Sequence, residues 1–301
     1  KRTKEDLEKA IAYFAEAIQK DPNYALAHAG MADCYTLMGR HLYLPVKEAF
    51  EKARDYANRA LELNDNLAEA HTSLAAVLLI YDWDWNAAEE QFKHAIQLNP
   101  NYATAHYWHS VLLQTKGWLH ESVTAVEKAQ VLDPLSPVIG MGVVQAYFFS
   151  EQYDKAIDEC RRYLEMNPNF VVAQDYLVHL HVQNGLFEKA AEDARRLVDI
   201  SERKAEATAH LAYVSAISGK THEAKKLFEA SMKDSTLGYS NPTIFITVYS
   251  ILGDQDNAFL WAEKALESGK IAFPSLRFSS DLKNFRTDPR YNSLLAKAHL
   301  K

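Results

Sequence analysis

A 34-residue repeat constrains this chain more than any other feature of its sequence. Four similar segments end at Pro22, Pro100, Pro134 and Pro168, and the last two prolines lie 34 residues apart (168 minus 134). A fixed period of roughly 20–50 residues is typical of repeat architectures, in which each unit is one supersecondary motif. The chain is therefore predicted to fold as a stack of similar units that each contact their neighbours.

Placing each proline at position 32 of its unit divides residues 25–272 into seven full units. Their first residues are Ala25, Ala68, Ala103, Pro137, Val171, Ala205 and Tyr239. The first unit is 43 residues long, nine more than 34, and the second unit has one extra residue within Tyr81–Asn86. We expect the first insertion to give a protruding hairpin, with Pro45 in the first turn of a long second helix ending near Asn64. Trp83 and Trp85 are expected to pack over helix ends.

Each unit is predicted to be a pair of antiparallel helices. Apolar residues at positions 4, 7, 8 and 11, and again at 20, 24 and 27, follow the spacing of two amphipathic helices. Position 20 is always small, as closely crossing helices require: Ala10, Ala53, Ala88, Ser122, Ala156, Ala190, Ala224 and Ala258. Glycines at position 15 are predicted to end the first helix in the left-handed conformation: Gly39, Gly117, Gly185, Gly219 and Gly253.

These positions resemble the tetratricopeptide repeat, a 34-residue helix–turn–helix with small residues at positions 8 and 20 and proline at 32. The resemblance covers most of the chain and implies an all-α fold, a right-handed α-solenoid of stacked antiparallel helix pairs. Position 4, often tryptophan in the family, differs here: it is His28, His71, His106, Gly140, Gln174, Thr208 and Pro242. The proline is replaced in four units, which leaves the angles between those repeats open: Asp65, Glu202, Thr236 and Lys270.

The two ends predict a single solenoid domain over residues 1–301, with a half repeat at 1–24 and a capping segment at 273–301. Residues 1–24 resemble only the second helix of a unit, with Thr3 as its N-cap. Because one helix of a pair cannot bury its apolar face alone, we expect the chain to be cut from a longer protein, or to pack its open end on another chain as a homodimer. Asp288–Tyr291 predicts a final capping helix with Pro289 in its first turn.

Several segments resemble, more specifically, the C-terminal repeat regions of bacterial regulatory proteins. They are Arg2–Leu7, Tyr81–Trp85, Asn99–His106, Leu132–Pro137 and Asp288–Tyr291. In that group the repeats follow a winged-helix DNA-binding domain, an adenylate cyclase domain or a protein kinase domain, and act as sensory or partner-binding arms. The resemblance implies a role in signalling or transcription regulation, and it leaves the preceding domain open.

Composition excludes several other classes. With 48% hydrophobic residues, 10 Gly and 9 Pro, the chain is neither disordered nor collagen-like. A net charge of −7 argues against direct binding of nucleic acid or an anionic membrane. The longest apolar run, Leu74–Tyr81, is far shorter than the roughly 18 residues that span a bilayer. Cys34 and Cys160 are expected to be buried and too distant to pair, and a reducing cytoplasm is expected.

Chemical motifs are few, and the chain is not expected to be an enzyme. Gly140–Gly142 is a fragment of a glycine-rich loop, but no strand precedes it, so we interpret it as a site of tight helix packing. The twelve histidines raise a metal hypothesis, because His106 and His109 share one helix face. Since His28, His71 and His106 occupy the same repeat position, we interpret them as a packing column. Neither a metal nor a cofactor is expected.

The concave surface is the predicted functional site. In the tetratricopeptide family, positions 2, 5, 6, 9, 12 and 13 line a groove, and none of them is Lys or Arg in the seven units. The cationic clamp that this family uses for a C-terminal carboxylate is therefore missing. The groove is predicted to bind an apolar or mildly basic extended peptide or partner helix, through Tyr107, Trp108, Val111, Met141, Gln145, Phe148, Asp175, Tyr176, His179 and Tyr213. The alternative is that positions 6 and 13 pack against the neighbouring repeat.

The expected function is a protein–protein interaction scaffold, the partner-binding or sensory arm of a larger bacterial regulatory protein. The alternative is a regulatory region of an adenylate cyclase or kinase that binds a small effector or mediates homo-oligomerisation. The sequence leaves the partner and the oligomeric state open.

Overall fold

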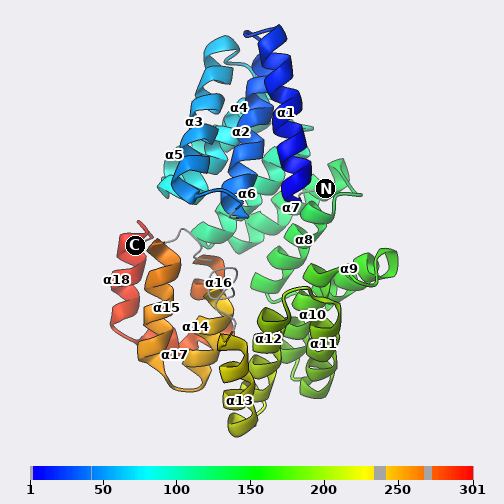
Figure 1. The fold of residues 1–301 in the computed structure, drawn as a ribbon, viewed down its shortest axis with the longest axis vertical. Coiled ribbons are helices and arrows are strands. Elements are labelled where there is room, and N and C mark those ends of the chain that lie inside the picture. The colour runs from blue at the N-terminus through cyan, green and yellow to red at the C-terminus, as the bar shows by residue number, and fades with distance from the viewer. Residues whose placement is uncertain (1–2, 42, 234–241, 268–272, 301) are drawn as a thin grey trace. The chain divides into compact units, whose positions relative to one another are not determined.

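A computed structural model describes residues 3–41, 43–233, 242–267 and 273–300, and within these ranges the chain forms helices and no strand (Figure 1). This confirms the predicted all-α class. Contacts divide the chain into two compact units, Lys1–Pro134 and Leu135–Lys301. The division coincides with a predicted repeat boundary, since the fourth repeat begins at Pro137. Thr236, Tyr239 and Lys270, named above from the repeat register, lie outside the described residues.

The first compact unit contains a single helix followed by three helix pairs. Its helices are α1 (Lys4–Lys20), α2 (Ala25–Arg40), α3 (Val46–Leu63), α4 (Ala68–Val77), the π-helix η1 (Leu78–Asp82), α5 (Trp85–Leu98), α6 (Ala103–Lys116) and α7 (Leu119–Leu132). Thr3 caps α1 as predicted, because its hydroxyl accepts a 3.2 Å hydrogen bond from the amide of Asp6. Leu7 of α1 packs against Cys34 and Leu37 of α2, so the half repeat covers the first full pair.

The insertion in the first repeat lengthens α3 and folds back on α1 and α2. Pro45 directly precedes α3, close to its predicted place in the first turn, and Asn64 follows the last residue of the helix. Tyr43 and Leu44 pack on the cluster formed by Leu7, Cys34, Leu37 and Met38. These two apolar residues are thus used to fix the connection between α2 and α3.

Gly39 corrects one prediction about the turns. The other four glycines do adopt the left-handed conformation, with φ of 88° at Gly117, 71° at Gly185, 82° at Gly219 and 82° at Gly253. Gly39 instead lies inside α2, which continues to Arg40. A Cβ at Gly39 would lie 2.8 Å from a ring carbon of Phe50. The glycine is needed here for close approach to α3, a role that sequence position alone does not distinguish from ending a helix.

The single extra residue of the second repeat is absorbed by η1. A π-helical turn holds one more residue than an α-helical turn, and such turns arise where a residue is inserted into a helix. Trp83 then leaves the helix with a left-handed φ of 54°. The carboxylate of Asp84 caps α5 by accepting a 3.0 Å hydrogen bond from the amide of Ala87. Trp85 is buried, in agreement with its predicted packing role.

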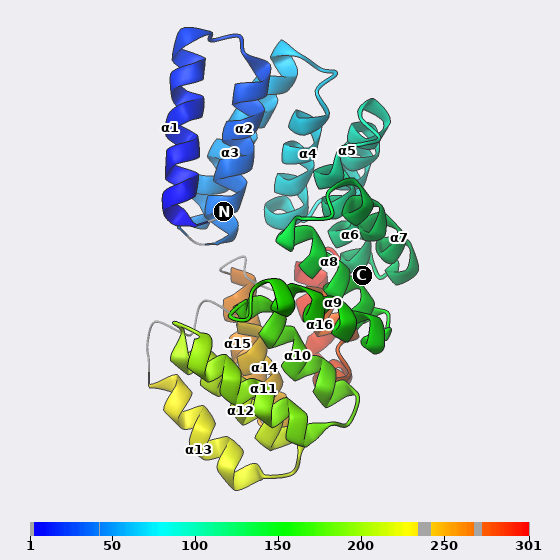
Figure 2. The ribbon, with the colours of Figure 1, turned by 90° about the vertical axis from the view of Figure 1, so that its right-hand side faces the viewer.

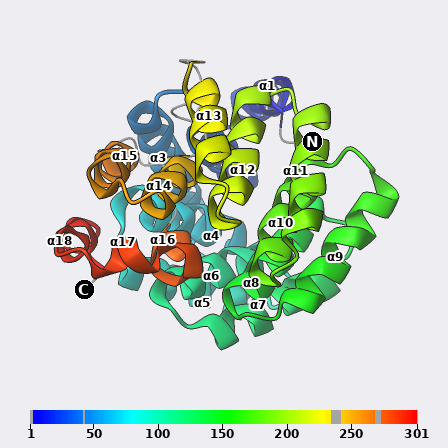
Figure 3. The same cartoon turned by 90° about the horizontal axis from the view of Figure 1, so that it is seen from below.

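The second compact unit holds the remaining repeats and the C-terminal segment (Figures 2 and 3). Its helices are α8 (Pro137–Phe149), α9 (Tyr153–Met166), α10 (Val171–Gln183), α11 (Phe187–Ile200), α12 (Lys204–Ile217), α13 (Thr221–Met232), α14 (Pro242–Ile251), α15 (Gln255–Glu267), α16 (Phe273–Phe278), the 3-10 turn η3 (Ser280–Leu282), α17 (Lys283–Thr287) and α18 (Arg290–Lys297). The first helices α8, α10, α12 and α14 form an arc, and α16 lies in contact with α8 (Figure 3).

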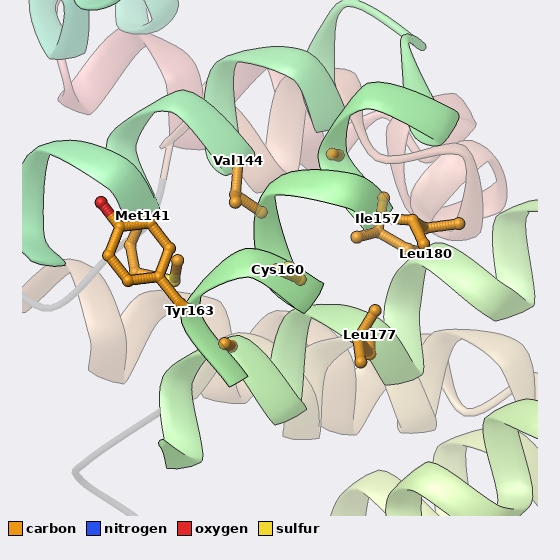
Figure 4. Packing of buried hydrophobic residues seen from close by; sticks show 9 residues of the cluster. Met141, Val144, Ile157, Cys160, Tyr163, Leu177 and Leu180 are labelled. Atoms are coloured by element: carbon orange, nitrogen blue, oxygen red, sulfur yellow. The ribbon is translucent and has the colours of Figure 1, made fainter. Parts of the chain in front are cut away.

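Small residues at position 20 hold each pair together as predicted. Ala156 is fully buried and belongs to the cluster where α8, α9 and α10 meet. Cys160, Val144 and Leu180 are members of the same cluster (Figure 4). Ala53, Ala88, Ser122, Ala190, Ala224 and Ala258 are also fully buried, whereas Ala10 is half-buried. Both cysteines are free and buried. They therefore contribute to packing, as the sequence indicated.

Gly140 is a site of tight helix packing, which confirms its interpretation. Tyr163 of α9 points towards α8, beside Met141, and occupies the space that a side chain at Gly140 would fill (Figure 4). The Tyr163 hydroxyl donates a 3.1 Å hydrogen bond to the carbonyl of Ser136. The absence of a Cβ at Gly140 thus allows the Tyr163 ring of α9 to pack against α8 and to bond to the residue that precedes α8.

The histidines at position 4 share a structural role. A ring nitrogen of each forms a hydrogen bond with the carbonyl six residues earlier: His28 with Pro22 at 3.0 Å, His71 with Asp65 at 2.8 Å, and His106 with Pro100 at 2.9 Å. These carbonyls belong to position 32 of the preceding unit. The histidine column therefore closes the connection between consecutive repeats.

The last helix packs on α15 of the final repeat. Arg290 of α18 forms a 2.8 Å ion pair with Asp256, and Lys297 forms a 2.6 Å pair with Glu263, both on α15. Among the described residues, no helix combines the length and the hydropathy that crossing a bilayer requires.

Candidate functional site

A cavity of about 160 Å³ lies within the second compact unit, between the first helices and the C-terminal segment. Its walls come from α8, α10, α14, α16 and η3. The lining residues are Gln145, Phe148, Phe149, Asp175, Tyr176, His179, Thr243, Ile244, Thr247, Ser275, Ser279 and Asp281. The cavity therefore combines aromatic walls with hydroxyl and carboxylate groups.

The repeat register places most of these side chains. Residues at positions 5, 6 and 9 of a first helix fall on one face, since position 9 follows positions 5 and 6 by four and three residues. Asp175, Tyr176 and His179 hold these positions in α10, and Thr243, Ile244 and Thr247 hold the same positions in α14. The cavity is thus built from the predicted groove positions of different repeats that the arc of helices brings face to face.

A compact polar cluster lies beside the cavity. On α10, Nε2 of His179 is 3.7 Å from Oδ1 of Asp175. From α12, Nδ1 of His210 is 3.0 Å from the same oxygen. The His179 ring is perpendicular to that of His210, with centroids 5.2 Å apart, and it also lies against Tyr213. Asp175 and His210 border a second hollow on their other side, lined by Glu206 and Arg203 among others.

Burial shifts the protonation equilibria of this cluster towards the neutral forms. It raises the pKa of Asp175 to about 6, against the opposing effect of His179. Burial lowers the pKa of His210 to about 4. It also lowers the pKa of His179, although the Asp175 carboxylate acts in the opposite direction. Both imidazoles are therefore neutral at physiological pH, and their ring nitrogens keep a lone pair.

The C-terminal segment closes one side of the cavity through Asp281. Its carboxylate accepts a 2.7 Å hydrogen bond from the hydroxyl of Tyr213 and two 3.1 Å bonds from the amide of Gln183. Ser280 donates a 2.5 Å hydrogen bond to the carbonyl of the Gln183 side chain. Phe278 contacts Phe149 with ring centroids 6.5 Å apart. The segment thus lies on the face that the repeats present to the interior of the arc.

The ten predicted groove residues fall into three groups. Gln145, Phe148, Asp175, Tyr176 and His179 line the cavity. Met141 and Tyr213 of the same compact unit are 8% and 0% exposed, so their side chains support the helices. Tyr107 and Trp108 of the first compact unit are also buried, at 7% and 1% exposure, while Val111 is half-buried.

The sequence prediction did not include two sets of residues that line the cavity. Thr243, Ile244 and Thr247 could have been found, because they occupy the same register positions as Asp175, Tyr176 and His179. Ser279 and Asp281 carry no such signal. They lie about 100 residues along the chain from Gln183, beyond the last repeat, and only the tertiary fold brings them to the cavity (281 minus 183 is 98).

Comparison with known proteins agrees with the repeat register. Models of the tetratricopeptide repeat match residues 2–41 and 143–170. A tetratricopeptide repeat protein from Parabacteroides merdae is 16% identical, with a TM-score of 0.57 over 85% of this chain and 93% of its own. The APC/C hetero-tetramer Cut9–Hcn1 is similar with 13% identity and a TM-score of 0.57, over 75% of this chain and 46% of that one. No curated protein sequence matches the chain.

The fold is thus that of an α-solenoid of helix pairs. Two of its segments match the tetratricopeptide repeat, and its fold is similar to that of solved tetratricopeptide repeat proteins.

Proposed function

We propose that the chain is a non-enzymatic scaffold that binds a segment of another protein in the cavity of the second compact unit. The tetratricopeptide fold supports the general class, because solenoids of this kind present extended concave surfaces to protein partners. The observation that carries the proposal is the lining: the register positions expected to face a ligand bring Phe148, Tyr176 and His179 to one cavity.

The size of the cavity favours a peptide over a small effector. Sites that enclose a whole small molecule measure roughly 300–1,000 Å³. The cavity here measures about 160 Å³, which suits one side chain of a longer segment. The rest of such a segment would lie along the exposed parts of α8 and α10. For this cavity, the comparison favours a protein partner over a small effector.

The lining chemistry defines the partner. The lining contains no Lys or Arg, so nothing there attracts a terminal carboxylate. Asp281 is already bound by Tyr213 and Gln183, which leaves Asp175 as the acidic group that a ligand would meet. A ligand with an aromatic or aliphatic residue next to a Lys or Arg could pack the first against the aromatic walls and pair the second with the Asp175 carboxylate. The expected ligand is therefore an apolar or mildly basic extended segment.

Selection of peptides from a random display library on the full chain tests this proposal. Each selected peptide would then be titrated against the wild type, a Phe148→Ala/Tyr176→Ala variant, and a Tyr13→Ala control, whose aromatic ring on α1 is 72% exposed. Aromatic anchors contribute about 1–2 kcal/mol each, so loss of both should weaken binding by roughly 30-fold to 1,000-fold. Equal affinity for the wild type and the double variant would reject the cavity as the binding site.

The wider setting is part of the proposal. The resemblance of five segments to repeat regions of bacterial regulatory proteins supports a sensory or partner-binding arm within a larger cytoplasmic protein. Homo-oligomerisation is the competing role, and it makes a different prediction: sedimentation velocity at several concentrations would show a mass that rises with concentration. A constant monomer mass together with peptide binding supports the scaffold.

A further inference from the structure

We propose that Asp175, His179 and His210 form a binding site for a divalent transition-metal ion, with Zn²⁺ as the ion that the ligand set fits best. Within the parts of the chain that the structure describes, their ligand atoms form a group in which all lie within 4.8 Å of one another. Two imidazoles and one carboxylate are a ligand set that zinc accepts in proteins. The proposal revises the expectation that the chain binds no metal, and it shares Asp175 and His179 with the cavity proposed to bind a peptide.

The spacing of the ligand atoms fits a shared ion. Zinc bonds of about 2.0–2.2 Å in tetrahedral geometry place neighbouring ligand atoms about 3.3 Å apart. Oδ1 of Asp175 is 3.0 Å from Nδ1 of His210 and 3.7 Å from Nε2 of His179. These two distances lie on either side of the ideal value. The His179 side chain is 23% exposed and borders the cavity.

Two buried atoms of the cluster lack the partners that buried polar atoms normally have. Nδ1 of His210 and Oδ1 of Asp175 are inaccessible to solvent and form no hydrogen bond in this structure, although they are only 3.0 Å apart. The angles at this contact do not allow a hydrogen bond, and His210 as a whole is 2% exposed. Leaving such atoms unpaired is costly. A cation bound to both would satisfy them at once.

The surroundings favour a cation. Glu206 acts electrostatically on both Asp175 and His210, and Asp281 acts on His179, so carboxylates surround the imidazoles. With three protein ligands the ion would keep a further position. That position would face the cavity that Asp175 and His179 line, where water or a donor atom of a bound ligand has access.

Zinc binding by the chelator-treated full chain tests the proposal. Calorimetric titration with Zn²⁺ should give one tight site per chain, and Zn²⁺ should raise the thermal midpoint. His179→Gln and His210→Gln should each weaken this site by at least about tenfold, since even indirect partners of metal ligands contribute that much. His222→Gln is the matched control, because His222 is an exposed histidine on α13 outside the cluster. It should leave the affinity unchanged.

Two results would overturn the site. One is the absence of a stoichiometric zinc site in the wild type. The other is equal zinc affinity in the wild type and His179→Gln, which would mean that zinc binds elsewhere among the histidines. Because His179 is half-buried, its substitution to Gln tests the site even if the change at buried His210 prevents folding. Circular dichroism of each variant before titration establishes which of them are folded.

Discussion

Gly140→Ala tests the packing between repeat helices more sharply than any other single substitution. A Cβ at this position would lie 1.9 Å from the hydroxyl oxygen of Tyr163 and 2.2 Å from two of its ring carbons. Tyr163 is 3% exposed and fixed within the cluster of α8, α9 and α10, so the ring has little room to move (Figure 4). The substitution must therefore displace the ring, and with it the hydrogen bond to Ser136.

The size of the effect follows from three contributions. Overpacking a buried site costs about 1–3 kcal/mol. Loss of the hydrogen bond from Tyr163 to the Ser136 carbonyl costs about 0.5–1.5 kcal/mol. Alanine has a better helix propensity than glycine, which returns about 1 kcal/mol. We expect a net destabilisation of about 1–3 kcal/mol, concentrated in α8, α9 and the elements that pack on them.

Native-state hydrogen exchange on the full chain measures this effect locally. Amides of α8–α10 should exchange faster in Gly140→Ala, whereas those of α1–α3 should be unchanged and serve as an internal control. In a Tyr163→Leu background the same glycine substitution should be neutral or stabilising, since the ring that it displaces is gone. Wild-type or greater protection of α8–α10 in Gly140→Ala alone would refute the packing argument, because helix propensity would then be the only contribution that matters.

Three further predictions concern other contacts. Asp281→Ala removes the acceptor of Tyr213 and Gln183, so unfolding free energy should fall by about 1–3 kcal/mol and residues 273–285 should exchange faster. Burial lowers the pKa of His109 to about 4. As the pH falls, His109 is therefore protonated in the unfolded chain before it is protonated in the folded chain. Denaturant midpoints should therefore fall between about pH 6.5 and 4, and less so in His109→Gln. His71→Ala loses bonds to Asp65 and Gln91 and should cost about 1–2 kcal/mol in denaturant unfolding.

The repeat register predicted the fold because one physical requirement recurs in every unit. Helices that cross closely need a small residue at the contact, and position 20 supplies it from Ala53 to Ala258. The first helices α2, α4, α6, α8 and α10 begin at the residues that the register predicts, and α12 begins one residue early at Lys204. The prediction that Gly39 ends a helix was wrong, because a glycine that allows two helices to approach closely and one that ends a helix look the same in sequence. The π-turn at Leu78–Asp82 could only be anticipated as one extra residue.

The candidate site was less accessible to sequence reasoning. Three residues at predicted groove positions, Phe148, Tyr176 and His179, line the cavity. Tyr213, which holds the same repeat position as His179, is buried instead, because the neighbouring first helix and the C-terminal segment cover it. Whether a groove position is open depends on the curvature of the stack and on what lies across it. Neither is encoded in the local periodicity, and Asp281 belongs to a segment outside the repeats.

The most direct test of the account is to map where a selected peptide contacts the full chain. Aromatic and methyl NMR signals would be assigned and followed during titration with one peptide from the display selection. We predict that the largest shifts occur at Phe148, Tyr176, His179 and Ile244, which face the cavity together. Shifts concentrated instead on the outer second helices, such as α9 and α11, with these four signals unmoved, would contradict the proposal that the cavity is the binding site.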